Sequence, residues 1–334
     1  MEKNSRIFTV SLNTSLDRTF YTEKIVFGDI NRITTGRLDA GGKGLNVARM
    51  LHRLGNKVEI VVCLGGDNGK VVARLATGEG LVLRPITTQG ETRNIFNFIE
   101  TCSGRILRIN EPGPVFSKRE KENLFRKLNS LPLGSSDILV LSGSLPPGLP
   151  EDTYQRIINQ IKSKTTFITL DADGQVLKKG VQAGPWLIKP NLWELARLLG
   201  GKVTSLNQLV RYGYRLMKRT GLKLILLTLG QFGALSLSSQ HLFWAKPPRV
   251  KPISEVGCGD AFLAGFLHGY KRNWALEECL MFAVACGTAK VLCPGTGMPS
   301  LKQVFSLKKQ VTMGQPEKLN LSFCYNPEYP CKIN

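Results

Sequence analysis

Residues 255–269 read Glu-Val-Gly-Cys-Gly-Asp-Ala-Phe-Leu-Ala-Gly-Phe-Leu-His-Gly. The stretch opens with three small residues, Gly257, Cys258 and Gly259, and continues as a run that is apolar on nearly every side. Such a run is typical of a buried helix. Because the glycine turn leaves backbone N–H groups free at the positive end of the helix dipole, the sequence predicts an anion-binding site at this turn.

Asp260 stands in the mouth of this predicted anion site. A carboxylate there repels a bound anion, so it is an odd choice for a simple phosphate cradle. It makes chemical sense as a general base that takes a proton from a hydroxyl group, whose oxygen then attacks the anion. Phosphoryl transfer needs this constellation. The alternative, from this segment alone, is that Asp260 only caps the helix, as aspartate often does.

A second glycine cluster, residues 41–48, favours the catalytic interpretation. It reads Gly-Gly-Lys-Gly-Leu-Asn-Val-Ala and continues into a helix-like stretch. Its three glycines allow a backbone to approach a ligand closely, while Lys43 supplies a cation and Asn46 a polar side chain. The spacing is not that of a Walker A loop, and the sequence has no dinucleotide fingerprint of Gly-x-Gly-x-x-Gly between a strand and a helix.

Composition narrows the class of protein. The 334 residues are enough for a large core with a smaller lobe. We expect no membrane span and no signal peptide, because no apolar run is long enough and the N-terminus leads straight into a strand-like segment. The eight cysteines form no Cys-x-x-Cys pair, so a zinc or redox site is disfavoured and a cytoplasmic location is expected.

The formal net charge of +20 suggests that the protein binds an anionic partner, either nucleic acid or a small molecule. Lysine and arginine are spread along the chain without an arm or much aromatic interleaving. We therefore favour a basic surface that attracts anionic small molecules over one that binds nucleic acid.

Short apolar runs alternate with helix-patterned stretches along most of the chain. This alternation predicts an α/β fold with a mostly parallel sheet and helices on both faces. In such sheets, ligands bind beyond the carboxyl ends of the strands. The expected strands lie at residues 8–10, 58–62, 138–141, 167–170, 186–188 and 224–228, and the expected helices at 43–55, 118–131, 151–163, 192–199 and 205–220.

Two stretches break the alternation, residues 18–40 and 92–111. Both are strand-like and rich in polar residues, and they flank the glycine cluster at 41–48 in the sequence. We expect them to form a small second sheet, a lid that excludes water during phosphoryl transfer. Because the helical pattern stops near residue 310, we expect one domain of residues 1–310 and a tail of residues 311–334.

With both glycine motifs in order, the chain resembles the phosphofructokinase B, or ribokinase-like, family of carbohydrate kinases over roughly residues 5–300. Residues 41–48 and 256–262 are similar to its two signatures. Residues 189–194, Lys-Pro-Asn-Leu-Trp-Glu, resemble its Asn-x-x-Glu element, and Thr228-Leu229-Gly230 its nucleotide-side loop. Residues 13–17, 92–94 and 109–114 are similar to the hexose-phosphate branch, which includes 1-phosphofructokinase and tagatose-6-phosphate kinase.

The resemblance implies a ribokinase-like, Rossmann-type core with a β-sheet lid, often shared across a dimer, and it implies ATP and Mg²⁺. It also assigns a role to each matching residue. Catalysis falls to Asp260 with the N–H groups of Gly257, Cys258 and Gly259; sugar-phosphate binding to Asp17, Gly41, Gly42, Lys43, Asn46 and Arg93; nucleotide binding to Lys189, Asn191, Thr228, Gly230 and Gly233; and Mg²⁺ to Glu194 acting through water.

The implied activity is ATP-dependent phosphorylation of a ketohexose phosphate. We favour fructose 1-phosphate as the substrate, and tagatose 6-phosphate and fructose 6-phosphate stay open. A sugar-phosphate sensor without turnover is the alternative from another class. The chain departs from the family pattern at Thr14-Ser15, Trp193, Glu255 and Cys258; Glu255 adds negative charge near the nucleotide, whereas the Cys258 substitution leaves the backbone N–H unchanged.

Overall fold

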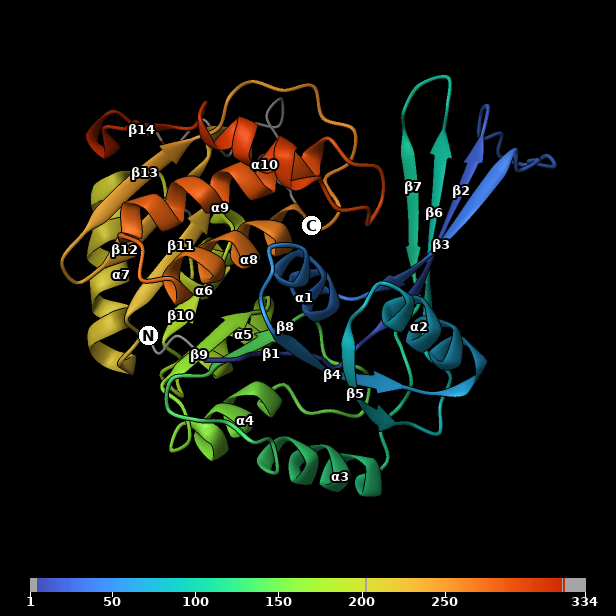
Figure 1. Ribbon diagram of the computed structural model, residues 1–334, viewed down its shortest axis with the longest axis horizontal. Coiled ribbons are helices and arrows are strands. Elements are labelled where there is room, and N and C mark those ends of the chain that lie inside the picture. Colours follow the sequence, from blue (N-terminus) through green and yellow to red (C-terminus); the bar gives the residue numbers. More distant parts are fainter. Residues whose placement is uncertain (1–4, 202, 320, 322–334) are drawn as a thin grey trace.

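The computed structural model describes residues 5–201, 203–319 and 321. A ten-stranded sheet forms the centre of the body (Figure 1). The parallel part comprises, in sheet order, β5 (Val82–Thr87), β4 (Val58–Leu64), β1 (Ile7–Ser11), β8 (Ile138–Ser142), β9 (Phe167–Asp171), β10 (Leu187–Ile188) and β11 (Leu224–Thr228). Antiparallel strands β12 (Ala234–Ser238), β13 (Leu242–Lys246) and β14 (Thr312–Gly314) extend the sheet beyond β11.

Helices cover both faces of this sheet, so its inner strands are apolar on both sides. In β1, Ile7 packs into one core and the next residue, Phe8, into the other. One face carries α1 (Lys43–Arg53), α2 (Gly66–Gly78), α8 (Cys258–Lys271), α9 (Leu276–Val291) and α10 (Leu301–Lys308). The other carries α3 (Lys118–Asn129), α4 (Thr153–Ile161), α5 (Gly174–Val181), α6 (Leu192–Leu199) and α7 (Leu206–Thr220).

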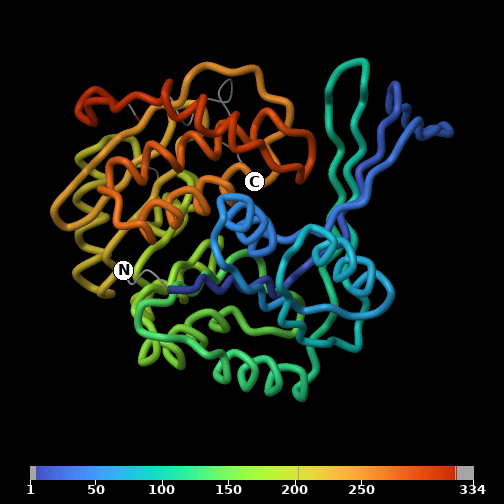
Figure 2. The backbone as a smooth tube through the Cα atoms, viewed as in Figure 1, coloured from blue at the N-terminus to red at the C-terminus, as the bar shows by residue number. Residues whose placement is uncertain are grey.

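A smaller four-stranded sheet stands beside the main one and projects from the body (Figures 1 and 2). Its strands, in order, are β3 (Thr35–Gly41), β2 (Ser15–Thr22), β6 (Arg93–Glu100) and β7 (Ile106–Asn110). We call this sheet the lid. The α/β class, the mostly parallel sheet with helices on both faces and the second small sheet are thus confirmed.

The two faces of the lid differ in chemistry because side chains alternate along each strand. One row across the strands holds Thr19, Asn97 and Arg108, whereas the adjacent row holds Phe20 and Phe98 beside an exposed leucine of β7. At these rows the lid is therefore polar on one face and apolar on the other.

Several elements carry little sequence signal. Strand β5 contains Arg84 and Pro85 at the edge of the main sheet, where a missing ladder donor is tolerated. The segment expected to be a tail begins with β14, which pairs with β13. Residues 320 and 322–334 of that tail lie outside the described residues. No helix in the described part of the chain is long and apolar enough to span a membrane.

Cys279, Cys286 and Cys293, which recur every seven residues in the sequence, are small buried side chains. Cys279 and Cys286 lie on α9 with no exposed surface, and Cys293 follows the helix and is also buried. Burial raises the pKa of the Cys279 thiol to about 12. These thiols are therefore packing residues, and the cytoplasmic location that we expect from the cysteine pattern stays a prediction.

Candidate active site

A cavity of about 1250 Å³ lies where the carboxyl ends of β10 and β11 face the polar side of the lid. This is the place where open α/β sheets bind ligands. All but one of the predicted site residues line it: Asp17, Gly42, Lys43, Asn46, Arg93, Lys189, Asn191, Glu194, Thr228, Gly230, Gly233, Gly257, Cys258, Gly259 and Asp260. Segments that are far apart in the sequence thus converge on one cavity.

The turn before α8 presents backbone donors to this cavity. Gly257 precedes the helix with a φ of 74°, in the left-handed region that favours glycine. The Cys258 N–H donates to the Glu255 carbonyl at 3.3 Å, so it is already engaged. For the N–H groups of Gly257 and Gly259, no acceptor is found among the residues that the structure describes. The predicted anion site therefore rests on these two donors more than on Cys258.

Asp260 lies in the first turn of α8, but its side chain does not cap the helix. The carboxylate instead accepts a hydrogen bond from Asn46 Nδ2 at 2.9 Å, which joins the two glycine motifs. Burial, and next the nearby charge of Asp171, raise the pKa of Asp260 to about 6. At neutral pH the group is thus ionised and basic enough to accept a proton in a transition state.

Asp171, at the end of β9, holds two lysines in the site. Its Oδ1 lies 3.3 Å from Lys189 Nζ and 3.6 Å from Lys43 Nζ, and its Oδ2 accepts a hydrogen bond from Ser142 Oγ at 3.2 Å. Burial alone would raise the pKa of Asp171, but Lys189 and Lys43 outweigh this and lower it. Asp171 in turn raises the pKa of Lys43, which therefore stays charged.

Asp171 is not among the site residues predicted from the sequence. The available signal was a carboxylate directly after a buried strand, at the edge where ligands bind. Spacing along the chain could not show that Lys43 and Lys189 meet there.

Asp17 faces the cavity from the first lid strand. Its carboxylate is buried and accepts a hydrogen bond from Ser15 Oγ at 2.6 Å. Burial raises the pKa of Asp17 to about 6. Gly41 is the one predicted site residue that does not line the cavity. A Cβ at Gly41 would stand 2.0 Å from Asp17 Oδ1, so this glycine makes room for the carboxylate.

Two arginines of the lid point to an anionic ligand on this side of the cavity. Arg93 is anchored by backbone carbonyls, with Nε 3.2 Å from Asn13 O and Nη1 3.1 Å from Glu111 O. Arg108 lines the same cavity, and its Nε donates to Asn97 Oδ1 at 2.9 Å. Arg93 was predicted from the sequence, whereas Arg108 was not. The sequence signal for Arg108 was a positively charged residue at a polar position of an alternating strand.

The Asn-x-x-Glu element forms the start of α6 as a capping box. The Asn191 side chain accepts from the Glu194 N–H at 2.8 Å, and Glu194 Oε2 accepts from the Asn191 N–H at 2.9 Å. Burial raises the pKa of Glu194. The capping box fixes this carboxylate at the wall of the cavity, so its geometry does not depend on a ligand.

The remaining nucleotide-side residues form the end of β11 and the turn after it. Thr228 ends the strand, and Gly230 begins the short 3₁₀ helix η1 (Gly230–Phe232). Gly233 has a φ of 89°, and a Cβ there would come 1.9 Å from the Ala245 carbonyl oxygen. Gly233 is thus required by strand packing, whatever it also does for a ligand.

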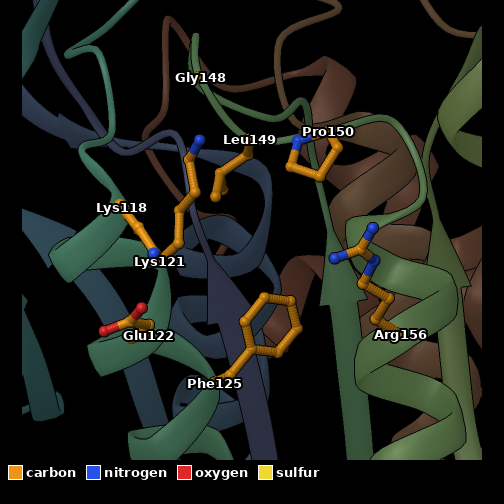
Figure 3. Close-up of a pocket in the computed structure, with 8 residues that line it drawn as sticks. All are labelled: Lys118, Lys121, Glu122, Phe125, Gly148, Leu149, Pro150 and Arg156. Carbon is orange, nitrogen blue, oxygen red and sulfur yellow. The ribbon is translucent and has the colours of Figure 1, made fainter.

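A second hollow, of about 690 Å³, lies between α3 and the start of α4 (Figure 3). Lys118, Lys121 and Arg156 make its rim basic, and Arg156 is already paired with Asp152. It contains none of the predicted site residues, and none of its lining side chains is a buried polar group without a partner in the described part of the chain.

The arrangement defines a class of protein. A buried general base beside free N–H groups, cations on both sides and a lid over the cavity are what a kinase of small molecules needs.

Comparison with known proteins confirms this class and narrows it. Residues 7–303 match the pfkB family of carbohydrate kinases, so the chain belongs to that family. A 1-phosphofructokinase of Bacillus subtilis is 32% identical over 306 residues, which cover 92% of this chain and 99% of the relative. An ATP-dependent 6-phosphofructokinase isozyme 2 of Mycobacterium tuberculosis is 31% identical over 297 residues, covering 88% and 86%. The tetrameric inhibited form of Escherichia coli phosphofructokinase-2 matches with a TM-score of 0.84 at 27% identity, covering 92% and 99%.

Proposed function

We propose that this chain is an ATP-dependent kinase of a ketohexose phosphate and that it converts fructose 1-phosphate to fructose 1,6-bisphosphate. The observation that carries the proposal is the position of Asp260. It is a buried base, hydrogen-bonded to Asn46, in the cavity that the lid arginines and the turn before α8 also line. The 1-phosphofructokinase relatives support the choice of sugar.

In the proposed reaction, Asp260 accepts the proton of the free primary hydroxyl of the sugar. The hydroxyl oxygen then bonds to the γ-phosphorus of ATP, in line with the bond that breaks to release ADP. Negative charge on the transferring group is stabilised by the N–H groups of Gly257 and Gly259 and by the ammonium groups of Lys43 and Lys189. Asp171 keeps both lysines in place.

The phosphate already on the sugar would bind Arg93 and Arg108. Arg93 is held at Nε and Nη1 and Arg108 at Nε, and a guanidinium group has five N–H donors, so each can still direct donors to phosphate oxygens. Asp17 and Asn46 would accept and donate hydrogen bonds to the sugar hydroxyls. The lid thus recognises the substrate, while the body provides the base and the phosphoryl-binding donors.

The residues present fit a Mg²⁺ that comes with the nucleotide. Mg²⁺ often needs only one or two carboxylates besides phosphates and water. Glu194 offers one carboxylate at the cavity wall, and no cluster of three or more candidate metal ligands occurs within residues 5–201, 203–319 and 321. Glu194 would hold Mg²⁺ through water, and the ion would neutralise phosphate charge.

A second candidate is 6-phosphofructokinase activity, which the Mycobacterium tuberculosis relative supports. A coupled ADP-release assay with fructose 1-phosphate, fructose 6-phosphate and tagatose 6-phosphate, at equal concentrations, separates these activities by kcat/KM. We expect the highest value for fructose 1-phosphate. Binding of these sugars without formation of ADP from ATP in the presence of any of them would contradict the kinase proposal and identify a sensor.

We also propose that two copies associate through the apolar face of the lid. Leu38 on β3 and Leu107 and Ile109 on β7 are exposed there, on the two edge strands of the lid. The tetrameric form of the Escherichia coli protein shows that a family relative self-associates. Light scattering should give a dimer that Ile109→Lys weakens, whereas Val82→Lys, at an exposed apolar position on β5, should not. A monomeric native protein would contradict this assembly.

A further inference from the structure

Lys290, near the end of α9, is fully buried. An ammonium group in such a place is costly unless opposite charge or several acceptors surround it. In the described part of the chain, no carboxylate lies within ion-pair distance of Lys290 Nζ, and one hydrogen bond is found, to the Gly295 carbonyl at 2.7 Å. An ammonium group has three donors, so Lys290 has capacity and charge to spare.

The side chain of Lys290 reaches the turn that we propose binds phosphate. A Cβ added to Gly257 would stand 3.5 Å from Lys290 Cε, 3.6 Å from Asn46 Nδ2 and 3.8 Å from Asp260 Oδ2. The stem of Lys290 therefore packs directly against the turn and lies close to the base. Because α9 packs along α8, this cation is carried by a rigid pair of helices.

We propose that Lys290 is a built-in cation of the α8 turn, which adds fixed positive charge beside the free N–H groups and strengthens the binding of the nucleotide phosphates. The inference rests on the proposed function, because it assumes that the turn binds phosphate. Lys290 acts on the bound anion through its field and is a positioning residue, not a catalytic one.

Lys290 has Asp260 nearby but no direct ion-pair partner in the described part of the chain, and this carries the proposal. A buried cation without a carboxylate partner is stabilised when an anion arrives beside it. Burial lowers the pKa of Lys290, and a bound phosphate would raise it again, so protonation of the lysine and anion binding favour each other. No other role in the proposed reaction explains why a charged side chain occupies this position.

A structural role is the competing explanation. Through Gly295, Lys290 also fixes the loop after α9, and that loop touches the lid. A Cβ at Gly295 would stand 3.9 Å from Asp39 Oδ2, and one at Gly297 would stand 3.5 Å from Arg37 Nη1. A hydrogen-bond donor without charge would be enough for this structural role. A neutral donor at position 290 should therefore keep ADP affinity if the role is structural and lose it if the charge matters.

The test compares Lys290→Met, which keeps the apolar stem, with Lys290→Gln, which keeps a donor but no charge. We expect both to weaken ADP binding, measured by calorimetry, about tenfold. KM for ATP should rise with them, whereas KM for the sugar phosphate should change little. Added ammonium chloride should restore part of the loss in Lys290→Met, relative to tetramethylammonium chloride at equal ionic strength. Lys308→Met is the control, because Lys308 pairs with Glu278 away from the cavity.

Native ADP affinity in Lys290→Gln would overturn the proposal and leave the structural role. If neither variant folds, the native enzyme provides the test. Because Lys290 already supplies a positive charge at the turn, turnover should be equal in sodium, potassium and tetramethylammonium salts. A requirement for one small cation would overturn the proposal. Failure of the proposed function would give another result. The native protein itself would then not bind ADP, or would form no ADP from ATP with any sugar phosphate.

Discussion

The two sheets that enclose the cavity follow opposite patterns. The inner strands of the main sheet are buried on both faces, and their site residues, such as Asp171 and Lys189, form a buried ionic network at one edge. The lid strands are half exposed, polar toward the cavity and apolar on the other face. The body thus holds its charged groups rigidly, whereas the lid presents Arg93 and Arg108 from a thinner layer.

This difference assigns the two halves of the reaction to the two sheets. A transition state needs groups that are already in place, and packed elements provide them. Recognition of a charged substrate can come from arginines on the thinner layer, because it does not require groups fixed against the reacting atoms. We therefore expect substitutions in the body to lower kcat and substitutions in the lid to raise KM for the sugar phosphate.

The largest expected effect is that of Asp260→Asn. Loss of the general base should lower kcat by about 10²–10⁴, while KM for the sugar phosphate changes little. Steady-state ADP release with fructose 1-phosphate measures both constants. Asp173→Asn is a matched control, because Asp173 is an exposed carboxylate at the same edge of the sheet and should keep native kcat. Near-native turnover of Asp260→Asn would show that another group takes the proton.

The lid arginines provide the next largest effect. Arg93→Ala and Arg108→Ala should each raise KM for the sugar phosphate about 10- to 100-fold, the range for losing a hydrogen-bonded ionic contact. In each case kcat should fall less than KM rises. A loss of kcat in either arginine variant as severe as that of Asp260→Asn would contradict the assignment of substrate recognition to the lid.

The pH dependence of kcat tests the body alone. Asp260 has a pKa of about 6, raised by burial, so the active carboxylate form is lost as pH falls through that value. We expect kcat to fall about tenfold per pH unit below 6. Saturating substrate is needed because phosphate esters titrate in the same range. Asp17→Asn should keep this inflection although Asp17 has a similar pKa, since Asp17 binds and does not take the proton. A flat profile down to pH 5 would contradict the assignment.

Local patterns were sufficient to predict the body, its strand–helix alternation and the two glycine motifs. Each motif is contiguous, and glycine turns at helix starts have few alternative explanations. Asp171 and Arg108 could not be predicted with a role. Asp171 matters because the fold brings it to Lys43 and Lys189, which come from two other segments, and Arg108 matters because the fold turns its lid strand toward the cavity. Lys290 is harder still: in the sequence it is an ordinary lysine on a helix, and its complete burial follows from the packing of α9 against α8.

The smallest expected effect is on stability, and it has the opposite sign to the effect on activity. The folded state raises the pKa of Asp260 from about 3.8 to about 6, so folding disfavours the ionised form. The resulting cost is absent below the unfolded pKa, grows between the two values and is complete above pH 6. Asp260→Asn removes that charge and should therefore increase the free energy of unfolding at pH 7.5 by about 1–3 kcal/mol.

The same substitution should have almost no effect on stability at pH 4, where the native carboxyl group is mostly protonated when folded. Urea unfolding at both pH values measures the difference, and Asp173→Asn again controls for the loss of one negative charge. A gain of equal size at both pH values would mean that packing, not charge, is responsible. A loss at pH 7.5 would mean that the hydrogen bond from Asn46 to the carboxylate outweighs its burial, and that the site is not strained in favour of function.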